Sequence, residues 1–312
     1  MVDIKSGLGG VARETVIIVN PTAHNLPSRE RLREADRWLQ DQGWRTQLLE
    51  TTRPREATAL AARAAERAVP LVFVCGGDGT MNEAANGLAG SETALAMIRG
   101  GVSNLWAREV GIPRRPVDAV RACVQGERRR IDLGRAGQRY FLLMAGYGLD
   151  GLISDRVSLR AKRYLGAVAY ALTAVRESLS YRSSPLTLRL DGEIHKADVL
   201  MLVAGNTRNY AGLVEITPEA RVDDGLLDVC VYEGRGTADI ILHALRTALR
   251  RHRSAKNVRY KQVRRLELAW ERPLPVQLDG DAYEESPTEV TVMPSALWVM
   301  VRQGLRSPLF SC

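Results

Sequence analysis

The sequence lacks the long apolar runs and nucleotide motifs of several large protein classes. No stretch of about 18 or more apolar residues occurs, so we expect no membrane-spanning helix. The opening segment MVDIKSGLGGVARE contains no apolar region of signal-peptide length, and a cytoplasmic location is the default expectation. Neither G-x-x-x-x-G-K-[ST] nor G-x-G-x-x-G is present, which disfavours P-loop and Rossmann chemistry.

Cysteine and histidine are few and scattered. The four cysteines form no C-x-x-C pair, so the sequence predicts neither a zinc site nor a disulfide framework. The four histidines occur at no metal-ligand or triad spacing. Cys75 ends an apolar segment, and we interpret it as a small buried hydrophobic residue rather than a nucleophile.

Basic residues are in excess, with a net charge of +8. All but five of the 44 basic residues are arginine. This charge is compatible with anionic partners such as lipid headgroups or nucleotide phosphates. Two local clusters, at 126–132 and 246–256, lack the interleaved aromatic residues of single-strand binders. We interpret both clusters as solvated helix faces and expect no nucleic-acid partner.

The chain of 312 residues is long enough for two domains. Strand and helix signals alternate over roughly the first 130 residues, which predicts a parallel sheet with helices on both faces. Short strands with turn signals then dominate and indicate an antiparallel, sandwich-like β domain. We predict an α/β nucleotide-binding domain at 1–132 and a β-rich domain at 133–312, whose extreme C-terminus could pack back on the first. The active site is expected in the cleft between them.

The segment LVFVCGGDGTMNEAANGL (71–88) joins a buried strand to a helix through glycines. The glycines of Gly76–Gly79 let the backbone approach a ligand closely. Thr80 and Glu83 have the spacing of a capping box, which predicts a helix start near Thr80. Free amide groups at such a start suit a phosphate. The alternative is a plain strand-to-helix turn with Asp78 as a turn residue. In the next glycine loop, Ser103 is expected to cap a helix.

Seven motifs follow one another in a characteristic order: VNPTAHN, CGGDGTMNEAANGL, RGGVSNLWAREVGIP, IDLGR, YFLLMAGYGLDG, AGNTRNYAGLVEITPEARVDDGLLDV and VQLDGD. Their set and order resemble the diacylglycerol kinase catalytic-domain family, which includes bacterial soluble lipid kinases and the sphingosine and ceramide kinases. The resemblance covers nearly the whole chain. GGDGT is shared with NAD kinases, whereas DDGLLDV and the late DGD favour the lipid-kinase branch.

The resemblance implies transfer of the γ-phosphoryl group of ATP, with Mg²⁺, to a lipid hydroxyl, with diacylglycerol as the expected acceptor. It also implies peripheral contact with a membrane and leaves open whether the protein is a homodimer. The residues expected to bind the nucleotide are Asn20, Pro21, Thr22, Ala23, His24, Thr51, Gly76, Gly77, Asp78, Gly79, Thr80, Met81, Asn82, Glu83, Gly101, Val102, Ser103 and Asn104.

Phosphoryl transfer needs a carboxylate that accepts the proton of the attacking hydroxyl. The family has Asp-Gly-Glu where this chain has Asp279, Gly280 and Asp281, and either aspartate could be the base. Asp78 is a third catalytic candidate, provided that Mg²⁺ bridges it to the phosphates or that it accepts a hydrogen bond. The alternative for VQLDGD is an ordinary Asp-Gly hairpin turn.

The segment RVDDGLLDV resembles the structural magnesium site of the family. By position, the ligands would be the Asp224 carboxylate and the backbone carbonyls of Arg221 and Leu226. A plain Asp-Asp-Gly turn is the alternative.

Two positions depart from the family pattern. Val102 replaces the threonine of Gly-Thr-x-Asn, although Ser103 could supply a hydroxyl, and Ala23 falls where the family tends to have a Ser-Gly pair. Two alternatives therefore stay open: a soluble-nucleotide kinase of NAD-kinase type, and a catalytically weak nucleotide- or membrane-binding module.

A long helix is expected after residue 155. One of its faces is basic and another is apolar, so it could lie on an anionic membrane or pack on its own sheet. The residues concerned are Arg156, Arg160, Arg163, Leu165, Ala169, Leu172 and Leu179.

Overall fold

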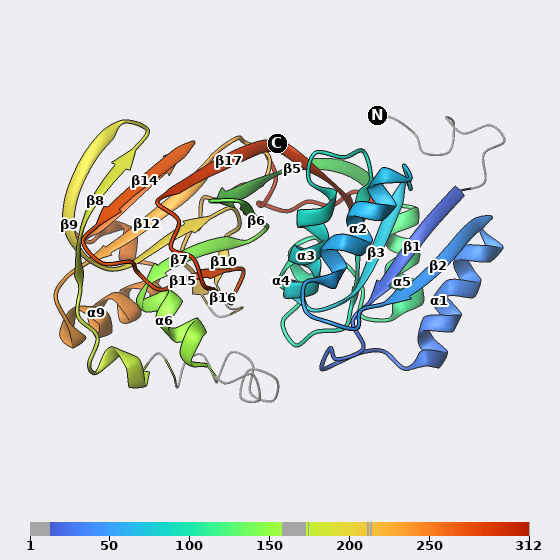
Figure 1. Cartoon of the computed structure of the whole chain (residues 1–312), viewed down its shortest axis with the longest axis horizontal. Coiled ribbons are helices and arrows are strands. Elements are labelled where there is room, and N and C mark those ends of the chain that lie inside the picture. The colour runs from blue at the N-terminus through green and yellow to red at the C-terminus, as the bar shows by residue number, and fades with distance from the viewer. Residues whose placement is uncertain (1–12, 158–172, 174, 211, 213, 312) are drawn as a thin grey trace.

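The chain forms an α/β half and a β-rich half that lie side by side (Figure 1). The computed structural model describes residues 13–157, 173, 175–210, 212 and 214–311. Fifteen strands of these residues belong to one continuous hydrogen-bonded sheet. The predicted fold class, a parallel α/β half followed by an antiparallel β-rich half, is confirmed.

The N-terminal half is built on a parallel sheet with the order β4-β3-β1-β2. Every residue of β3 is buried, as its unbroken apolar sequence predicts. Helices α1 and α5 pack against each other, and α2 packs against α3. The elements are β1 (Arg13–Val19), α1 (Arg29–Asp41), β2 (Trp44–Glu50), α2 (Glu56–Glu66), β3 (Leu71–Gly76), α3 (Asp78–Leu88), β4 (Ala94–Arg99), α4 (Leu105–Glu109) and α5 (Pro116–Val124).

The C-terminal half is mostly antiparallel. Asp191 and Gly192, with φ of 48° and 94°, form the predicted two-residue turn between β8 and β9. The elements are β6 (Arg139–Phe141), β7 (Met144–Gly148), α6 (Leu149–Arg156), β8 (Ser184–Leu190), β9 (Glu193–Gly205), β10 (Asn209–Tyr210), β11 (Val214–Glu215), β12 (Leu227–Glu233), α9 (Thr237–Ala248), η1 (His252–Ser254), β13 (Val258–Val263), β14 (Arg265–Trp270), β15 (Val276–Leu278) and β16 (Asp281–Tyr283).

Two long strands, β5 (Glu127–Ala136) and β17 (Glu289–Val301), connect the halves (Figure 1). They pair antiparallel with each other, and β17 also pairs in parallel with β4. Leu309 and Phe310 then pack into the core of the N-terminal half. The predicted division after residue 132 falls inside β5 and stays a prediction.

The basic cluster at 126–132 lies on a strand, so its interpretation as a helix face is wrong. Arg128 and Arg130 stack on the Trp298 ring, with guanidinium carbons 3.9 and 4.8 Å from its centroid, and both pair with Glu92. The strand conformation places alternate residues on one face, which brings both arginines onto the same indole.

The predicted long helix is described only at its two ends. Arg156 ends α6, and Leu179 is 66% exposed. Its other named residues, Arg160, Arg163, Leu165, Ala169 and Leu172, lie outside the described residues. No helix in the described part of the chain is long and apolar enough to cross a membrane.

Candidate active site

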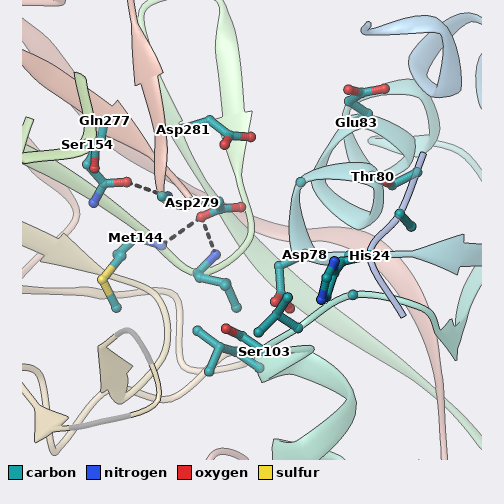
Figure 2. A pocket seen from close by; sticks show the side chains of 18 of the residues that line it. His24, Asp78, Thr80, Glu83, Ser103, Met144, Ser154, Gln277, Asp279 and Asp281 are labelled. Carbon is teal, nitrogen blue, oxygen red and sulfur yellow. Dashed lines mark hydrogen bonds between the residues drawn. The ribbon is translucent and has the colours of Figure 1, made fainter. Parts of the chain in front are cut away.

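A cleft of about 490 Å³ lies between the two halves (Figure 2). Of the residues predicted from the sequence, those that line it are Asn20, Thr22, Ala23, His24, Gly77, Asp78, Gly79, Thr80, Glu83, Gly101, Val102, Ser103, Asp279 and Asp281. The predicted nucleotide residues that are not among its lining are Pro21, Thr51, Gly76, Met81, Asn82 and Asn104.

Helix α3 begins at Asp78, two residues earlier than predicted, and its N-cap residue is Gly77. The predicted capping box is therefore wrong. Thr80 Oγ1 accepts a hydrogen bond from Asn20 Nδ2 at 3.0 Å, and the Glu83 carboxylate accepts from a different helix start. The first turn of α3, where backbone amides have no partner four residues back in the helix, lines the cleft at a glycine-rich turn.

Glu83 supports the N-terminus of α2 from the neighbouring helix. Its carboxylate accepts from the amides of Arg55 (3.1 Å) and Ala57 (3.3 Å), where α2 has no side-chain cap of its own. Burial raises the pKa of Glu83, whereas the hydrogen bonds from these two amides lower it. The nearby charge of Asp281 raises it further.

Asp78 is a capping residue for α4. Its Oδ1 accepts from the Trp106 amide at 3.4 Å, so the carboxylate takes the place at this helix start that we predicted for Ser103. The expected Ser103 cap is wrong: the N-cap residue is Asn104, in a left-handed conformation. Burial raises the pKa of Asp78 to about 6, although backbone amides around Trp106 lower it.

The two glycine loops touch each other. A Cβ on Gly101 would lie 2.5 Å from the Cα of Gly77, so only glycine allows this approach. The buried side chain of Asn104 fixes the contact, because its Nδ2 donates to the Gly76 carbonyl (3.0 Å) and its Oδ1 accepts from the Gly101 amide (3.1 Å). Asn104 thus holds the loop backbones together from behind the cleft.

Asp279 and Gly280 form the two-residue turn between β15 and β16, with φ of 53° and 85°. The half-buried Asp279 side chain accepts from the amides of Leu142 (2.8 Å), Leu143 (2.8 Å) and Met144 (2.9 Å). Figure 2 shows the bond from Met144. Burial raises the pKa of Asp279 to about 7, while the three amides lower it. The Asp279 carboxylate therefore makes its hydrogen bonds to backbone amides of the protein.

Asp281 follows the turn and is exposed at the cleft. A Cβ on Gly79 would lie 2.8 Å from Asp281 Oδ2, so this carboxylate lies directly over the first turn of α3. The structure thus separates the two aspartates that the sequence left equivalent: Asp279 holds the turn, and Asp281 faces the glycine loop of the other half.

A buried polar group that the sequence analysis missed supports this turn. Gln277 Oε1 accepts from the Gly280 amide (2.6 Å), and Gln277 Nε2 donates to Asp150 Oδ2 (2.8 Å). Tyr210 donates its hydroxyl to the other oxygen of Asp150. Burial raises the pKa of Asp150, and the Tyr210 and Gln277 hydrogen bonds lower it. Asp150 is part of the motif GYGLDG, but its partners Gln277 and Tyr210 are distant in sequence.

The predicted structural magnesium residues are not at this cleft. Arg221 and Asp224 line a second cavity, and Asp224 Oδ1 accepts from the Leu226 amide at 3.0 Å. Among the described residues, no group of three or more acidic, histidine or cysteine side chains is arranged to hold a metal. The ligand set Arg221, Asp224 and Leu226 stays a prediction.

Comparison with known proteins agrees with this architecture. Residues 14–136 match the family model of the diacylglycerol kinase catalytic domain, and residues 144–301 match that of the YegS C-terminal NAD kinase beta sandwich-like domain. The chain belongs to the diacylglycerol kinase family. The family named in the sequence analysis is thereby confirmed, and its kinase activity makes the chain a phosphotransferase.

Relatives in this family cover most of the chain. A "Probable lipid kinase YegS-like" protein of Chromohalobacter salexigens is 30% identical over 93% of this chain and 94% of its own length. A "Diacylglycerol kinase" of Bacillus subtilis is 28% identical over 85% of this chain and 88% of its own. A crystal structure of a diacylglycerol kinase from Bacillus anthracis shares the fold, with a TM-score of 0.77 at 23% identity over 93% of this chain and 97% of that one.

Proposed function

We propose that this diacylglycerol kinase family member transfers the γ-phosphoryl group of ATP to the hydroxyl of diacylglycerol in the cleft between its halves. The observation that carries the proposal is the position of Asp281 over the first turn of α3. It places a carboxylate from the β-rich half beside the backbone amides of the α/β half. A base and a phosphate cradle then meet at one point.

The phosphate cradle is made of backbone rather than of basic side chains. The first turn of α3, at the positive end of the helix dipole, lines the cleft, and Gly77 and Gly101 contribute no side chain there. The residues present fit a triphosphate, because Gly77, Gly79 and Gly101 line this part of the cleft with backbone alone. Thr80 and Ser103 add hydroxyl groups to this wall.

Asp281 is the proposed general base. It accepts the proton of the lipid hydroxyl while the hydroxyl oxygen forms a bond to the γ-phosphorus and the bond from that phosphorus to the β–γ bridging oxygen breaks, so that ADP leaves. Asp279 does not compete for this role, because its carboxylate already accepts three backbone amides. Its role is to fix the turn that carries Asp281.

The oxygen-rich cleft suits Mg²⁺, which binds proteins through one or two carboxylates and takes its other ligands from phosphates and water. When bound, Mg²⁺ would neutralise charge that develops on the phosphate oxygens. Asp78, which lines the cleft at the first turn of α3, is the carboxylate that would hold it, and Asp281 is left to act as the base.

The acceptor side of the cleft is formed by α6 and the β10–β11 hairpin. Asp150, Ser154 and Tyr210 line it, and Ser154 Oγ has no hydrogen-bond partner among the described residues. Hydroxyl and carboxyl groups of this kind suit the glycerol hydroxyl and ester oxygens of diacylglycerol. We propose that the lipid headgroup enters along this wall.

The test is transfer of radiolabelled γ-phosphate from ATP to detergent-dispersed diacylglycerol, monoacylglycerol, sphingosine and ceramide, with NAD as a soluble acceptor. We expect labelled phosphatidic acid, and we expect chelation of divalent cations to abolish it. Label on NAD and on no lipid would contradict the proposal and favour a soluble-nucleotide kinase.

A further inference from the structure

Helix α9 buries two polar residues and exposes most of its apolar ones. Its buried residues are His243 and Thr247. Every exposed residue within the helix is alanine, isoleucine or leucine: Ala238, Ile241, Leu242, Ala244, Leu245 and Ala248. A surface helix normally buries its apolar stripe in the core. The outer face of α9 therefore has the composition of a face that meets an apolar partner.

Specific contacts fix this orientation. His243 Nε2 lies 2.8 Å from the Glu233 carbonyl, and the Thr247 hydroxyl lies 2.9 Å from the Tyr232 hydroxyl. The Tyr232 ring also packs edge-on against His243, with centroids 5.1 Å apart. Rotating the helix to bury its leucines would break these buried hydrogen bonds. The outward position of the apolar side chains is thus imposed by the fold.

The exposed apolar surface is large. Ile241, Leu245 and Leu249 are 60%, 56% and 58% exposed, and they follow one another at four-residue spacing along one face. Val175 and Leu179, at 64% and 66%, lie on the helical segment beside it, where the Thr237 hydroxyl donates to the Ser178 and Leu179 carbonyls (Figure 1). We call these five side chains, Val175, Leu179, Ile241, Leu245 and Leu249, the α9 patch.

Arginines flank the segments of the α9 patch in sequence, and Arg176, Arg235 and Arg250 each lie 3.6–3.9 Å from a carboxylate, of Glu177, Asp198 and Glu215. The side chains of Arg176, Arg235 and Arg250 are 86%, 88% and 76% exposed, and Arg251 is exposed as well. The exposed residues of α9 itself include no carboxylate. An apolar face bordered by guanidinium groups is complementary to a bilayer with anionic headgroups, since the apolar side chains enter the acyl boundary while the cations meet the phosphates.

Helix α9 is connected to the cleft wall through α6. Ile240 of α9 packs against Leu149 and Ile153 of α6 and against Val157, the residue that follows this helix. The same helix α6 contributes Asp150 and Ser154 to the cleft wall. Helix α6 thus contacts α9 and also carries two residues of the wall that we assign to the lipid acceptor.

We propose that the α9 patch docks the protein on an anionic lipid bilayer and so presents the cleft to its membrane-resident acceptor. The presentation of the cleft to a lipid acceptor rests on the proposed function, but binding of the α9 patch to a bilayer does not require catalysis. It can therefore be measured on vesicles that contain neither diacylglycerol nor ATP.

The experiment uses the full chain and sedimentation with vesicles of equimolar phosphatidylcholine and phosphatidylglycerol. The test variant combines Ile241→Gln, Leu245→Gln and Leu249→Gln, because glutamine keeps helix propensity. The matched control is Ile194→Gln, since Ile194 is also 60% exposed but lies on the β8–β9 hairpin. Thermal unfolding checks that each variant folds, and sedimentation velocity reports the oligomeric state.

We expect the triple variant to lose at least about tenfold in vesicle partitioning, because each leucine or isoleucine contributes by burial in the acyl boundary. The control variant should bind like the wild type, and wild-type binding should weaken with salt and with pure phosphatidylcholine. Unchanged partitioning of the triple variant would overturn the proposal. Loss of a dimer with unchanged partitioning would also overturn it and would assign the face to a second copy of the chain.

The two proposals fail in different ways. If the wild type binds vesicles through the α9 patch but labels no lipid, docking stands and the proposed phosphotransfer to diacylglycerol falls. If it labels short-chain diacylglycerol in solution but the triple variant partitions normally, the chemistry stands and the docking proposal falls.

Discussion

Asp281 and Gly79 lie in contact across the cleft, and each comes from a different half of the chain. A Cβ at position 79 would approach Asp281 Oδ2 to 2.8 Å. Because the obstacle is a side-chain carboxylate and not backbone, a larger residue at position 79 displaces the carboxylate and leaves the fold intact. This contact couples the proposed base to the proposed phosphate cradle.

Gly79→Ala should therefore reduce turnover more than stability. A displaced base costs roughly 100-fold in rate when its position shifts by about 1 Å. The stability change should stay within about 0.5 kcal/mol, since alanine suits the first turn of a helix. Steady-state kinetics and urea unfolding measure the two effects. Full activity of this variant would show that Asp281 need not approach α3.

Asp279→Asn should mainly destabilise the protein. An asparagine amide offers one acceptor oxygen where three backbone amides need acceptors, and a buried donor left without one costs about 1–3 kcal/mol. Asparagine tolerates the left-handed backbone at this position, so the turn itself can form. Thermal unfolding is the measurement. A variant as stable as the wild type but without transfer would instead make Asp279 the base.

Gln277 is predicted to position the Asp279–Gly280–Asp281 turn. Gln277→Met removes the acceptor of the Gly280 amide and the donor to Asp150, which should cost about 1–3 kcal/mol and lower kcat. Gln277→Glu keeps an acceptor for the Gly280 amide but places a second carboxyl group next to that of Asp150.

The Gln277→Glu variant should also gain stability relative to the wild type as the pH falls from 8 to 5. Two neighbouring buried carboxyl groups then share a proton, and the neutral one can donate to the other. Urea unfolding across this range tests the prediction. An equal loss of stability at both pH values would show that residue 277 does not interact with Asp150.

Asp78 should make stability fall as the pH rises through its native pKa. Burial raises that pKa from the ordinary 3.8 to about 6, so between these values the native state binds more protons than the unfolded state. The contribution is about 3 kcal/mol over the interval. Asp78→Asn should make the dependence of unfolding free energy on pH between 4 and 6 less steep than in the wild type. A variant with the same slope as the wild type would place the effect on another group.

The sequence motifs located the glycine loops and the late Asp-Gly-Asp turn, because these elements carry their geometry in local residue types. They failed where a side chain uses a tertiary partner. Thr80 and Glu83 have capping-box spacing, yet they bond to Asn20 and to the start of α2. The spacing of residues within one segment does not show which distant group a side chain will bond to.

Asp150 and Gln277 were missed for a related reason. They are brought together only by the antiparallel pairing of β7 with β15, across most of the β-rich half. The orientation of α9 was equally hidden, since helical periodicity separates an apolar from a polar face but does not say which is buried.

The most direct test of the central claim is the rate of γ-phosphate transfer from ATP to diacylglycerol by Asp281→Asn, measured beside the wild type. Asparagine keeps the size of the side chain but cannot accept the hydroxyl proton. The predicted result is a loss of about 10²–10⁴-fold in kcat with unchanged thermal stability. A variant that retains wild-type turnover on diacylglycerol would contradict the assignment of Asp281 as the base.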